Sequence, residues 1–527
     1  MFTYSDASTS SNVAPAPGYL IKVQDQFGRS VGFEYQVPAG GSPTIDGRIA
    51  KIVDPSGQPV QVAYVGSGLA SLRWQDLALR QFNYDHPLHP WALTGVVDEN
   101  GNGFSTFGYD SAGRAISTER AGGVDRFSVT YAQPPAVATV DVYDEVADVV
   151  LRTRSWQSPT GVLLSLPTGA AGAMTASGLH GAPHLTGQLQ SAGSGCAASS
   201  SAIAYDANAN VASSDDFNDN RSCYAHDLAR NLETTRVEGL STSAVCSAVT
   251  GQGVSLPTGS RKTSTQWHPD WRLESRKAEP GRITTSIHNG QPDPFNGNAI
   301  ASCAPASALL PDGKPIAVLC KQVEQATMDA NGALGFVAVL DASTAPRVQS
   351  WTYNEFGQML THDGPRTDVS DVTTYTYYST TTADHTKGDL QSMTNALGKT
   401  TQYTKYNPHG QLLQSVDPNG VVTVNTYDLR QRLLSTTAGG LSTSFIYDPA
   451  GQLTRVTQPD GSYVGYEYDA AHRQTALFDS LGNRIEYTLD NAGNRTAERI
   501  KDPTGVLRRQ RAWSIDALGR VQQATGE

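Results

Sequence analysis

The sequence is short of charged residues. Asp, Glu, Lys and Arg make up 17% of its 527 residues, against about 25% in ordinary soluble domains. The net charge is −11, and no block of Lys and Arg occurs. A protein that binds nucleic acid through its phosphates carries the opposite balance of charge. We therefore predict no nucleic-acid partner.

Long apolar runs are also missing. A membrane-spanning helix needs about 18 or more consecutive apolar residues, and the sequence contains no such run. Residues 1–19 lack the basic segment and the apolar core of a signal peptide. The sequence thus predicts no membrane span, and it shows no signal peptide.

Cysteine is scarce and irregularly spaced. The five cysteines are Cys196, Cys223, Cys246, Cys303 and Cys320. None of them forms a C-x-x-C pair, and their spacing does not match a zinc site. Two interpretations stay open. Either two disulfides form and one thiol is left over, or the thiols are reduced and partly buried.

Motifs of catalysis are absent. The sequence holds neither H-E-x-x-H nor G-x-S-x-G, and no nucleophile, base and orienting group can be assembled from spacing. His268 and Asp270 are more typical of a turn anchored by Trp267 and Trp271 than of an acid–base pair. We therefore predict no enzyme, no catalytic residue and no cofactor.

One loop resembles half of a calcium site. Asp98, Asn100 and Asn102, followed by Gly103, match the first ligand positions of a calcium-binding loop. The twelfth position requires a bidentate Glu, and Tyr109 stands there. Short Asn- and Gly-rich loops are typical of hairpins, so we predict a hairpin turn and no metal site.

Glycine and tyrosine are what the sequence has in quantity. It contains 50 Gly, and its 22 Tyr outnumber its 13 Phe. Alternating segments such as 462–468 are rich in aromatic and β-branched residues and lie between Asp- and Gly-containing turns. This pattern is typical of strands joined by tight turns. The composition predicts an all-β protein.

A repeat is clearest between Tyr406 and Arg520. A Tyr-containing turn recurs there about every 20 residues. Its anchors are Tyr406, Tyr427, Tyr447, Tyr468, Leu489 and Ile515. A second Asp- or Gly-containing turn lies inside each period, which leaves room for two strands of about six residues. Each period is therefore predicted to be a β-hairpin that pairs with the next.

The motif Tyr-Asp-x-x-Gly-[Arg/Asn/Gln] resembles the YD repeat of the RHS-repeat family. Its best copies begin at Tyr109 and Tyr447. Some copies depart from it, since Gln431 and His472 replace Gly. The residues that define the repeats are Tyr109, Asp110, Gly113, Arg114, Tyr205, Asp206, Tyr353, Gly357, Tyr406, Gly410, Tyr427, Asp428, Tyr447, Asp448, Gly451, Tyr468, Asp469, Asp490, Gly493, Asp516, Gly519 and Arg520. We assign them a structural role.

Two details of the repeat are also predicted. In the turn that begins at Asp216, we expect Asn220 to occupy the glycine position, because Asn tolerates the left-handed region. The recurring Tyr side chains are expected to pack across neighbouring strands. The alternative is an aromatic platform for sugars or for a partner protein.

The resemblance implies a fold and a function. RHS-repeat proteins are spiral β-cages, and in bacterial polymorphic toxins the cage holds a C-terminal toxic domain. We expect consecutive antiparallel hairpins coiled into a spiral β-sheet shell or an open segment of one. The expected function is encapsulation or presentation of a toxin or effector polypeptide that is not in this chain, or assembly with other shell segments. The alternative is a cell-surface adhesion or carbohydrate-binding module.

The resemblance also places the protein and divides the chain. Family members are secreted or associated with the cell surface. We expect YD-type repeats in 1–165, a Gly/Ala/Ser-rich loop, linker or weakly matching repeat pair in 166–202, degenerate repeats with a long insertion near 291–320 in 203–350, and regular repeats in 351–527. The chain is expected to end in mid-repeat, as a fragment, a truncated product or one part of a split system would.

Overall fold

A computed structural model describes residues 1–43, 46–131, 143–144, 149–150, 162–165, 171–179, 182–190, 197–515 and 521–526. Strands and tight turns account for nearly all of this part of the chain. Within it, the helical segments are α1 (Cys246–Val249) and two 3-10 turns, η1 (Ala121–Gly123) and η2 (Gly335–Val337). The all-β prediction is confirmed.

The strands of the N-terminal part form what we call the first arm, residues 1–131. They are β1 (Phe2–Tyr4), β2 (Leu20–Gln24), β3 (Ser30–Gln36), β4 (Arg48–Val53), β5 (Pro59–Val65), β6 (Gly68–Arg73), β7 (Leu79–Asn83), β8 (Gly95–Val97), β9 (Gly103–Tyr109), β10 (Ala115–Arg120) and β11 (Val124–Tyr131).

The middle of the chain continues the same sheet with most of its strands. Its strands are β12 (Tyr143–Asp144), β13 (Val149–Val150), β14 (Val162–Ser165), β15 (Ala171–Leu179), β16 (Ala182–Gln190), β17 (Ser199–Tyr205), β18 (Val211–Asp215), β19 (Asn220–Asp227), β20 (Leu232–Ser241), β21 (Arg261–Trp267), β22 (Glu274–Glu279), β23 (Arg282–His288), β24 (Pro292–Asp293), β25 (Ala299–Ile300) and β26 (Leu319–Ala326).

The remaining strands form the last arm, residues 347–515, and the strand after it. They are β27 (Arg347–Tyr353), β28 (Met359–Asp363), β29 (Thr373–Tyr377), β30 (Leu390–Thr394), β31 (Thr400–Tyr406), β32 (Leu412–Val416), β33 (Val422–Tyr427), β34 (Leu433–Ala438), β35 (Leu441–Tyr447), β36 (Leu453–Thr457), β37 (Tyr463–Tyr468), β38 (Gln474–Asp479), β39 (Arg484–Leu489), β40 (Arg495–Lys501), β41 (Leu507–Ile515) and β42 (Val521–Thr525).

One antiparallel sheet contains 38 of these strands. Each of its strands pairs with the next along the chain, so the sheet is a succession of hairpins. Pairing passes directly from β11 to β14 and from β23 to β26, and β12–β13 and β24–β25 form separate two-stranded sheets. The predicted consecutive antiparallel hairpins are confirmed.

A β-bulge recurs at the repeat tyrosine. The pairing register shifts just before Tyr353, Tyr427, Tyr447 and Tyr468, and each of these residues lies opposite the residue six positions later. A bulge bends its strand and increases the local right-handed twist. Because the bulge is repeated, the bends add up along the sheet and coil it.

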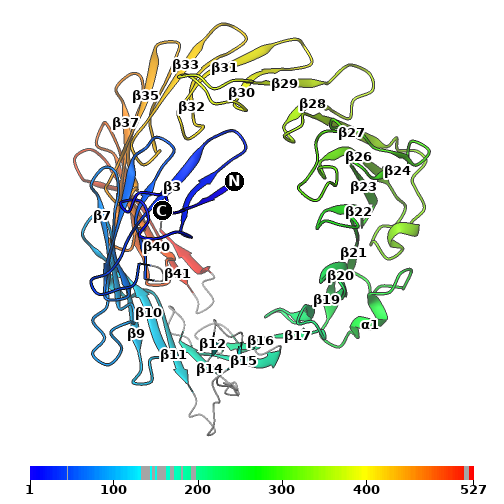
Figure 1. The fold of residues 1–527 in the computed structure, drawn as a ribbon. Helices are drawn as coiled ribbons and strands as arrows, with labels where there is room; N and C mark the ends of the chain where they lie inside the picture. The colour runs from blue at the N-terminus through cyan, green and yellow to red at the C-terminus, as the bar shows by residue number, and fades with distance from the viewer. Residues whose placement is uncertain are drawn as a thin grey trace.

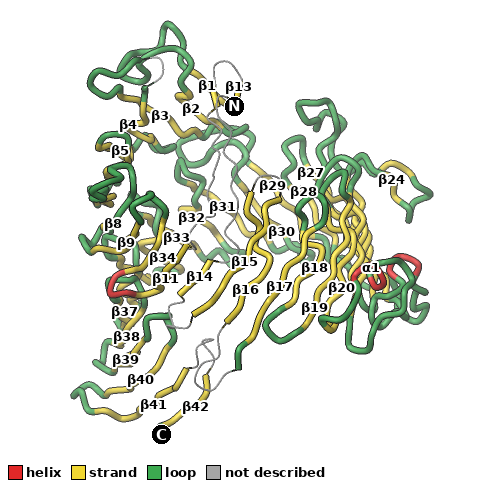
Figure 2. Tube along the Cα trace, turned by 90° about the horizontal axis from the view of Figure 1, so that it is seen from below, coloured by secondary structure: helices red, strands yellow, loops and turns green. Residues whose placement is uncertain are grey.

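The coiled sheet bends into a ring. In Figure 1 the chain passes from the first arm, through the middle strands, to the last arm, which returns to the side of the ring where the first arm lies. Figure 2, viewed from below, shows the strands lying side by side along the curved sheet. The two arms touch through hydrogen bonds such as the one from Asn100 to Asp448. The ribbon therefore overlaps itself.

Most of the wall is one sheet thick. Strands of the last arm such as β32 and β36 consist entirely of half-buried residues. A hydrophobic core appears in the middle of the chain, where Cys223, Val237, Leu240 and Val249 pack together. Stability along the arms thus depends chiefly on pairing between neighbouring hairpins, as in other repeat proteins.

Two segments depart from the regular hairpins. Strands β15 and β16 lie within 166–202, where we expected a loop, a linker or a weakly matching repeat pair, so their part of that segment belongs to the wall. Between β23 and β26, residues 289–318 leave the main sheet and carry the small β24–β25 hairpin. The predicted domain boundaries stay a prediction.

Candidate functional site

The repeat turn is built on one aspartate. In the copy at Asp110, the Oδ1 atom accepts the backbone N–H groups of Ala112 and Arg114 at 3.0 and 2.9 Å. The Arg114 Nε atom donates to Oδ2 of the same aspartate at 2.7 Å. Gly113 has φ 77°, a conformation that glycine adopts without steric cost. These hydrogen bonds hold the pKa of Asp110 below its ordinary value.

The other predicted turn residues have the same arrangement. The aspartates at 206, 428, 448, 469 and 490 each accept the N–H of the residue four positions later. Gly357, Gly410, Gly451 and Gly493 have positive φ. Asn354 and Asn407 replace aspartate and accept the same bond. The predicted residues Asp516, Gly519 and Arg520 lie outside the described residues.

The glycine position tolerates other side chains at a cost. Ala209, Gln431 and His472 occupy it with φ of 65°, 66° and 63°, which strains a side chain that carries a Cβ. The prediction for Asn220 is wrong, because Asp219 holds the positive φ of 61°. Asn220 is one residue later and donates back to Asp216, as Arg114 does to Asp110.

The repeat tyrosines fasten each hairpin to the one before it. The hydroxyl of Tyr447 donates to the carbonyl oxygen of Leu433 at 3.0 Å, and that of Tyr468 donates to Leu453 at 2.9 Å. Equivalent bonds are made by Tyr109, Tyr205, Tyr406 and Tyr427. Burial raises the pKa of Tyr447 and Tyr468. With their hydroxyls engaged, these side chains support the wall, and a sugar-binding role for them stays a prediction.

Tyr353 differs from the other repeat tyrosines. It is half-buried, and burial raises its pKa. Its backbone N–H donates to the carbonyl of Cys303 at 2.8 Å. This bond joins the start of the last arm to the 289–318 insertion.

The first and last arms meet along what we call the seam. It joins the turns at 25–29, 54–58, 74–78 and 98–102 of the first arm to turns of the last arm between 354 and 473. Figure 1 shows the two arms on the same side of the ring. The turns of one arm thus face the turns of the other.

At one end of the seam, an ion pair and an aromatic contact occur together. Arg29 pairs with Asp389, whose side chain is buried. The ring of Phe27 lies 5.4 Å from that of Phe356 in an edge-on contact. An ion pair shielded from water gains more than an exposed one, so this end is held by both charge and packing.

In the middle of the seam, His409 and Arg430 of the last arm lie against aspartates of the first arm. His409 Nε2 lies 3.1 Å from Asp54 Oδ2, and Arg430 Nε lies 2.8 Å from Asp76 Oδ2. The Arg430 guanidinium also lies over the ring of Trp74 at 5.6 Å. Burial raises the pKa of Asp54, but hydrogen bonds from Ser56, from the Gln58 backbone and from His409 outweigh it, so the pKa is lowered.

The most buried contact of the seam joins Asp98 to His472. The Asp98 side chain is 0% exposed, and its Oδ2 atom lies 2.7 Å from His472 Nε2. Asp98 Oδ1 accepts the N–H groups of Asn100 and Asn102. The His472 ring also stacks on Phe104 at 4.4 Å. The strained backbone of His472 therefore coincides with a contact that depends on its side chain.

The predicted hairpin turn at Asp98 is present, but its position in the seam was not foreseen. Sequence reasoning weighed Asp98 only as a calcium ligand or a local turn residue. The one signal that could have found the contact was His472 in a glycine position. A strained residue that is retained implies a compensating interaction, but the sequence does not name the partner.

His268 acts as a turn residue. Its Nδ1 atom accepts the N–H groups of Asp270 and Trp271, while Asp270 binds Lys314 at 2.5 Å. Trp267 Nε1 donates to the carbonyl of Glu233 at 2.8 Å. His268 and Asp270 therefore do not form an acid–base pair, and the turn is anchored as predicted for Trp267.

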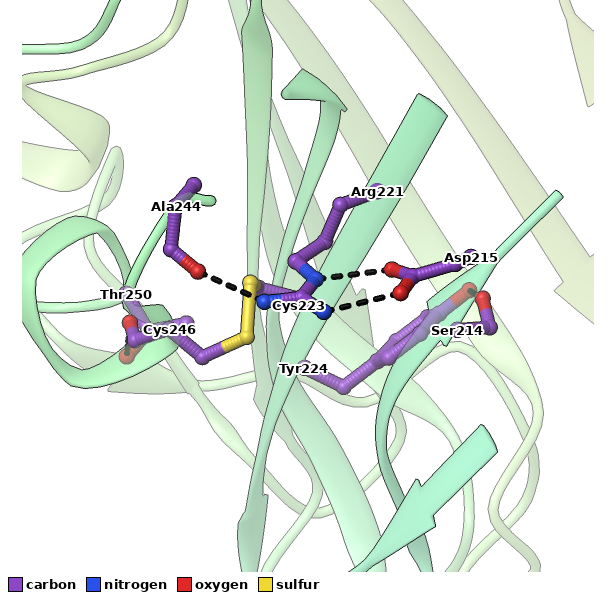
Figure 3. The surroundings of a disulfide bond; sticks show 8 residues. All are labelled: Ser214, Asp215, Arg221, Cys223, Tyr224, Ala244, Cys246 and Thr250. Atoms are coloured by element: carbon purple, nitrogen blue, oxygen red, sulfur yellow. Dashed lines mark hydrogen bonds and ion pairs between the residues drawn. A yellow bond between two sulfur atoms is a disulfide. The ribbon is translucent and has the colours of Figure 1, made fainter. Parts of the chain in front are cut away.

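Two disulfides close the irregular middle. Cys223 pairs with Cys246, and Cys303 pairs with Cys320. Figure 3 shows the first disulfide beside the bidentate pair of Arg221 and Asp215. Arg221 also donates to the carbonyl of Ala244, near Cys246. The disulfide interpretation applies to these four cysteines, and Cys196 lies outside the described residues.

No metal-binding cluster of three or more His, Cys, Asp or Glu side chains occurs in the described part of the chain. Among the same residues, no helix is long and apolar enough to cross a membrane.

The turn aspartates that recur along the wall accept hydrogen bonds from backbone and side-chain donors of their own turns. These aspartates hold the wall together. No catalytic domain is evident in the described ranges.

The repeats are now matched by a family model. The model described as RHS Repeat matches residues 385–422, 406–443, 427–463 and 447–477. This part of the chain consists of RHS repeats. The matched residues lie in the last arm, where the tyrosine and aspartate positions are most regular.

Two known proteins are similar to this chain, one in sequence and one in structure. Double-stranded DNA deaminase toxin A of Burkholderia cenocepacia (strain H111) is 30% identical over 158 residues, which cover 30% of this chain and 11% of that protein. The crystal structure of TcdB2-TccC3 without its hypervariable C-terminal region has a TM-score of 0.54 at 13% identity. That match covers 96% of this chain and 26% of the solved chain. The chain therefore shares the long antiparallel sheets of that structure, and it spans only part of the length of either protein.

Proposed function

We propose that this RHS-repeat protein is a segment of a shell wall that encloses or presents a polypeptide and does no chemistry itself. The observation that carries the proposal is the seam. One continuous sheet bends until its two arms touch, and buried pairs such as Asp98–His472 hold them together. A sheet that curves onto itself makes a barrier around an interior, which an open surface for adhesion does not need.

The enclosed partner is proposed to be a toxin or effector polypeptide. One relative is named as a toxin, and the solved relative was crystallised without a hypervariable C-terminal region. Both names support a wall that serves a variable polypeptide. This chain spans 11% and 26% of these relatives, so further shell segments are proposed as partners in the same assembly.

The proposed place of action is outside the cell or at its surface. Two disulfides, Cys223–Cys246 and Cys303–Cys320, support it, because disulfides persist in oxidising compartments and are rare in the reducing cytosol.

The test is protease protection of the enclosed polypeptide. The complete natural gene product would be purified and treated with protease, and the fragments followed by mass spectrometry. We expect the polypeptide beyond the repeats to survive in the parent protein. It should be digested when the seam is opened by Arg430→Glu together with His472→Glu, which place like charges beside Asp76 and Asp98.

The matched control is Arg499→Glu, an exposed residue on β40, which should leave protection unchanged. Equal digestion in the parent protein and in the seam variant would overturn the enclosing role. An intact polypeptide in both would show that something other than the seam protects it.

A further inference from the structure

A cavity opens beside strands β22 and β23, away from the seam. Its volume is about 300 Å³, and it lies between these strands, the His268 turn and the β24–β25 hairpin of the insertion. Its walls include Ser275, Arg276, Ser286, His288 and Asn298, together with His268. A cavity of this size holds a small molecule.

Arg276 gives the cavity a positive charge that no carboxylate of the described residues neutralises. Burial lowers the pKa of Arg276, with no opposing carboxylate to raise it. No Asp or Glu forms an ion pair with it in the described part of the chain. Its guanidinium lies over the ring of Phe336 at 4.8 Å, and an aromatic face attracts a cation without neutralising it. A half-buried guanidinium without a counter-charge favours an anion.

His288 adds a second unsatisfied group. The residue is 6% exposed, and its Nδ1 atom is enclosed without a hydrogen-bond partner. Burial is the main reason that the pKa of His288 is lowered, so the ring is neutral near pH 7. A neutral imidazole nitrogen donates or accepts one hydrogen bond, according to its tautomer. A buried polar atom without a partner costs free energy, and His288 is one of the residues that line the cavity.

The neighbouring groups leave these two free for a ligand. His268 packs edge-on against His288 at 5.6 Å, and its Nδ1 is already occupied by backbone donors. Among the residues that the structure describes, no Asp or Glu lines the cavity. The nearby Asp270 and Asp293 are paired with Lys314 and Lys321. An anion entering the cavity therefore meets no uncompensated carboxylate.

We propose that this cavity binds a small hydroxylated anion, whose carboxylate or phosphate group pairs with Arg276 and one of whose hydroxyl groups bonds to His288. Sugar acids and sugar phosphates have this chemistry. The site is separate from the seam and from the turn aspartates. It would give the outer insertion a recognition role that the wall does not require.

The test is calorimetric titration of the protein with glucuronate and glucose 6-phosphate, with glucose as the uncharged probe. We expect one site per chain, with a dissociation constant of about 1 mM or tighter for at least one anion. Glucose should bind at least about tenfold more weakly, because it lacks the group that pairs with Arg276. No heat from either anion at millimolar concentration, or equal binding of glucose, would overturn the proposal.

Variants then locate the site. Arg276→Gln should weaken anion binding about tenfold or more, and the exposed control Arg499→Gln should not change it. His288→Phe should bring the affinity for glucuronate close to that for acetate, since the hydroxyl contact is lost. If circular dichroism shows that Arg276→Gln does not fold, Arg276→Lys decides, because it keeps the charge and loses the two-pronged contact. Unchanged binding in a folded Arg276 variant would refute the assignment.

Discussion

At the scale of single residues, the wall depends on one side chain doing several things at once. Asp110 closes its turn with Oδ1 and holds Arg114 with Oδ2. Asn354 in the same position accepts the same backbone bond, which explains why Asp and Asn alternate along the repeats. The tyrosine hydroxyl then ties one hairpin to the previous one, as Tyr447 does with Leu433.

Removing one of these hydroxyls should loosen one hairpin junction. Tyr447→Phe keeps the ring and deletes the bond to the Leu433 carbonyl, at a cost of about 1 kcal/mol. The midpoint of urea unfolding should fall, and amide hydrogen exchange should rise in β34 and β35. The control is Tyr466→Phe, because Tyr466 is half-buried and its hydroxyl makes no hydrogen bond to another described residue. Equal effects of the two substitutions would show that the hydroxyl bond contributes nothing.

At the scale of elements, the seam uses turns that are otherwise routine parts of the hairpins. His472 takes a strained backbone conformation and in return reaches the buried Asp98 and the ring of Phe104. Ala209 has the same kind of backbone conformation, φ 65°, in a turn outside the seam. Comparing these two positions therefore separates the free-energy cost of the strained backbone from the stabilisation that the His472–Asp98 contact provides.

Glycine should have opposite effects at these two positions. Ala209→Gly relieves strain and should stabilise the protein by up to about 1 kcal/mol. His472→Gly relieves similar strain but leaves the buried Asp98 carboxylate without its partner, so a net loss of about 1–2 kcal/mol is expected. Chemical unfolding measures both. Stabilisation by His472→Gly would mean that the contact with Asp98 is worth less than the strain.

The second disulfide should protect the insertion rather than the arms. The Cys303–Cys320 bond closes a loop with a sequence separation of 17, which corresponds to about 3 kcal/mol of loop-closure stabilisation. Replacing both cysteines by serine should expose residues 289–318 to limited proteolysis. Replacing Cys223 and Cys246 should instead expose the segment around α1. Mapping the cuts by mass spectrometry tests this, and cleavage first in the last arm would contradict it.

At the scale of the whole molecule, the pKa values of several turn aspartates are shifted in the same direction. Hydrogen bonds hold the pKa of Asp110, Asp216 and Asp479 below the ordinary value, and that of Asp502 at about 2. A group with a lowered pKa in the folded state stabilises the fold above its unfolded value of about 4. That stability is lost as the pH falls through the folded value. Because the turns are repeated, acid acts on the wall everywhere at once.

The wall should therefore be sensitive to acid between about pH 4 and pH 2. Urea unfolding midpoints are expected to be level near neutral pH and to drop steeply in that range. Asp502→Asn keeps the turn, as Asn354 does in its own, and removes one titrating group. This variant should lose less stability on acidification than the parent protein. A parallel loss in both would rule out a contribution from the carboxylate of Asp502.

Much of this molecule follows from local chemistry that the sequence displays. The hairpins, their turns and the order of pairing depend on residues within about 20 positions of one another, such as Tyr447, Asp448 and Gly451. The prediction from local sequence was wrong at one position, because Asp219, and not Asn220, has the positive φ in the turn that begins at Asp216. The family resemblance rested on the same short-range pattern, and the repeat match to the last arm agrees with it.

The tertiary structure alone decided what lies far apart in sequence. The pairs Arg29–Asp389, Arg430–Asp76 and Asp98–His472 join residues hundreds of positions apart. They exist only because the twist contributed by each bulge accumulates and brings one arm onto the other. The cavity around Arg276 and His288 likewise forms only once the insertion folds over β22 and β23. The residues of each repeat determine how it pairs with the next repeat. The sum of the small bends along the sheet determines which distant residues come into contact.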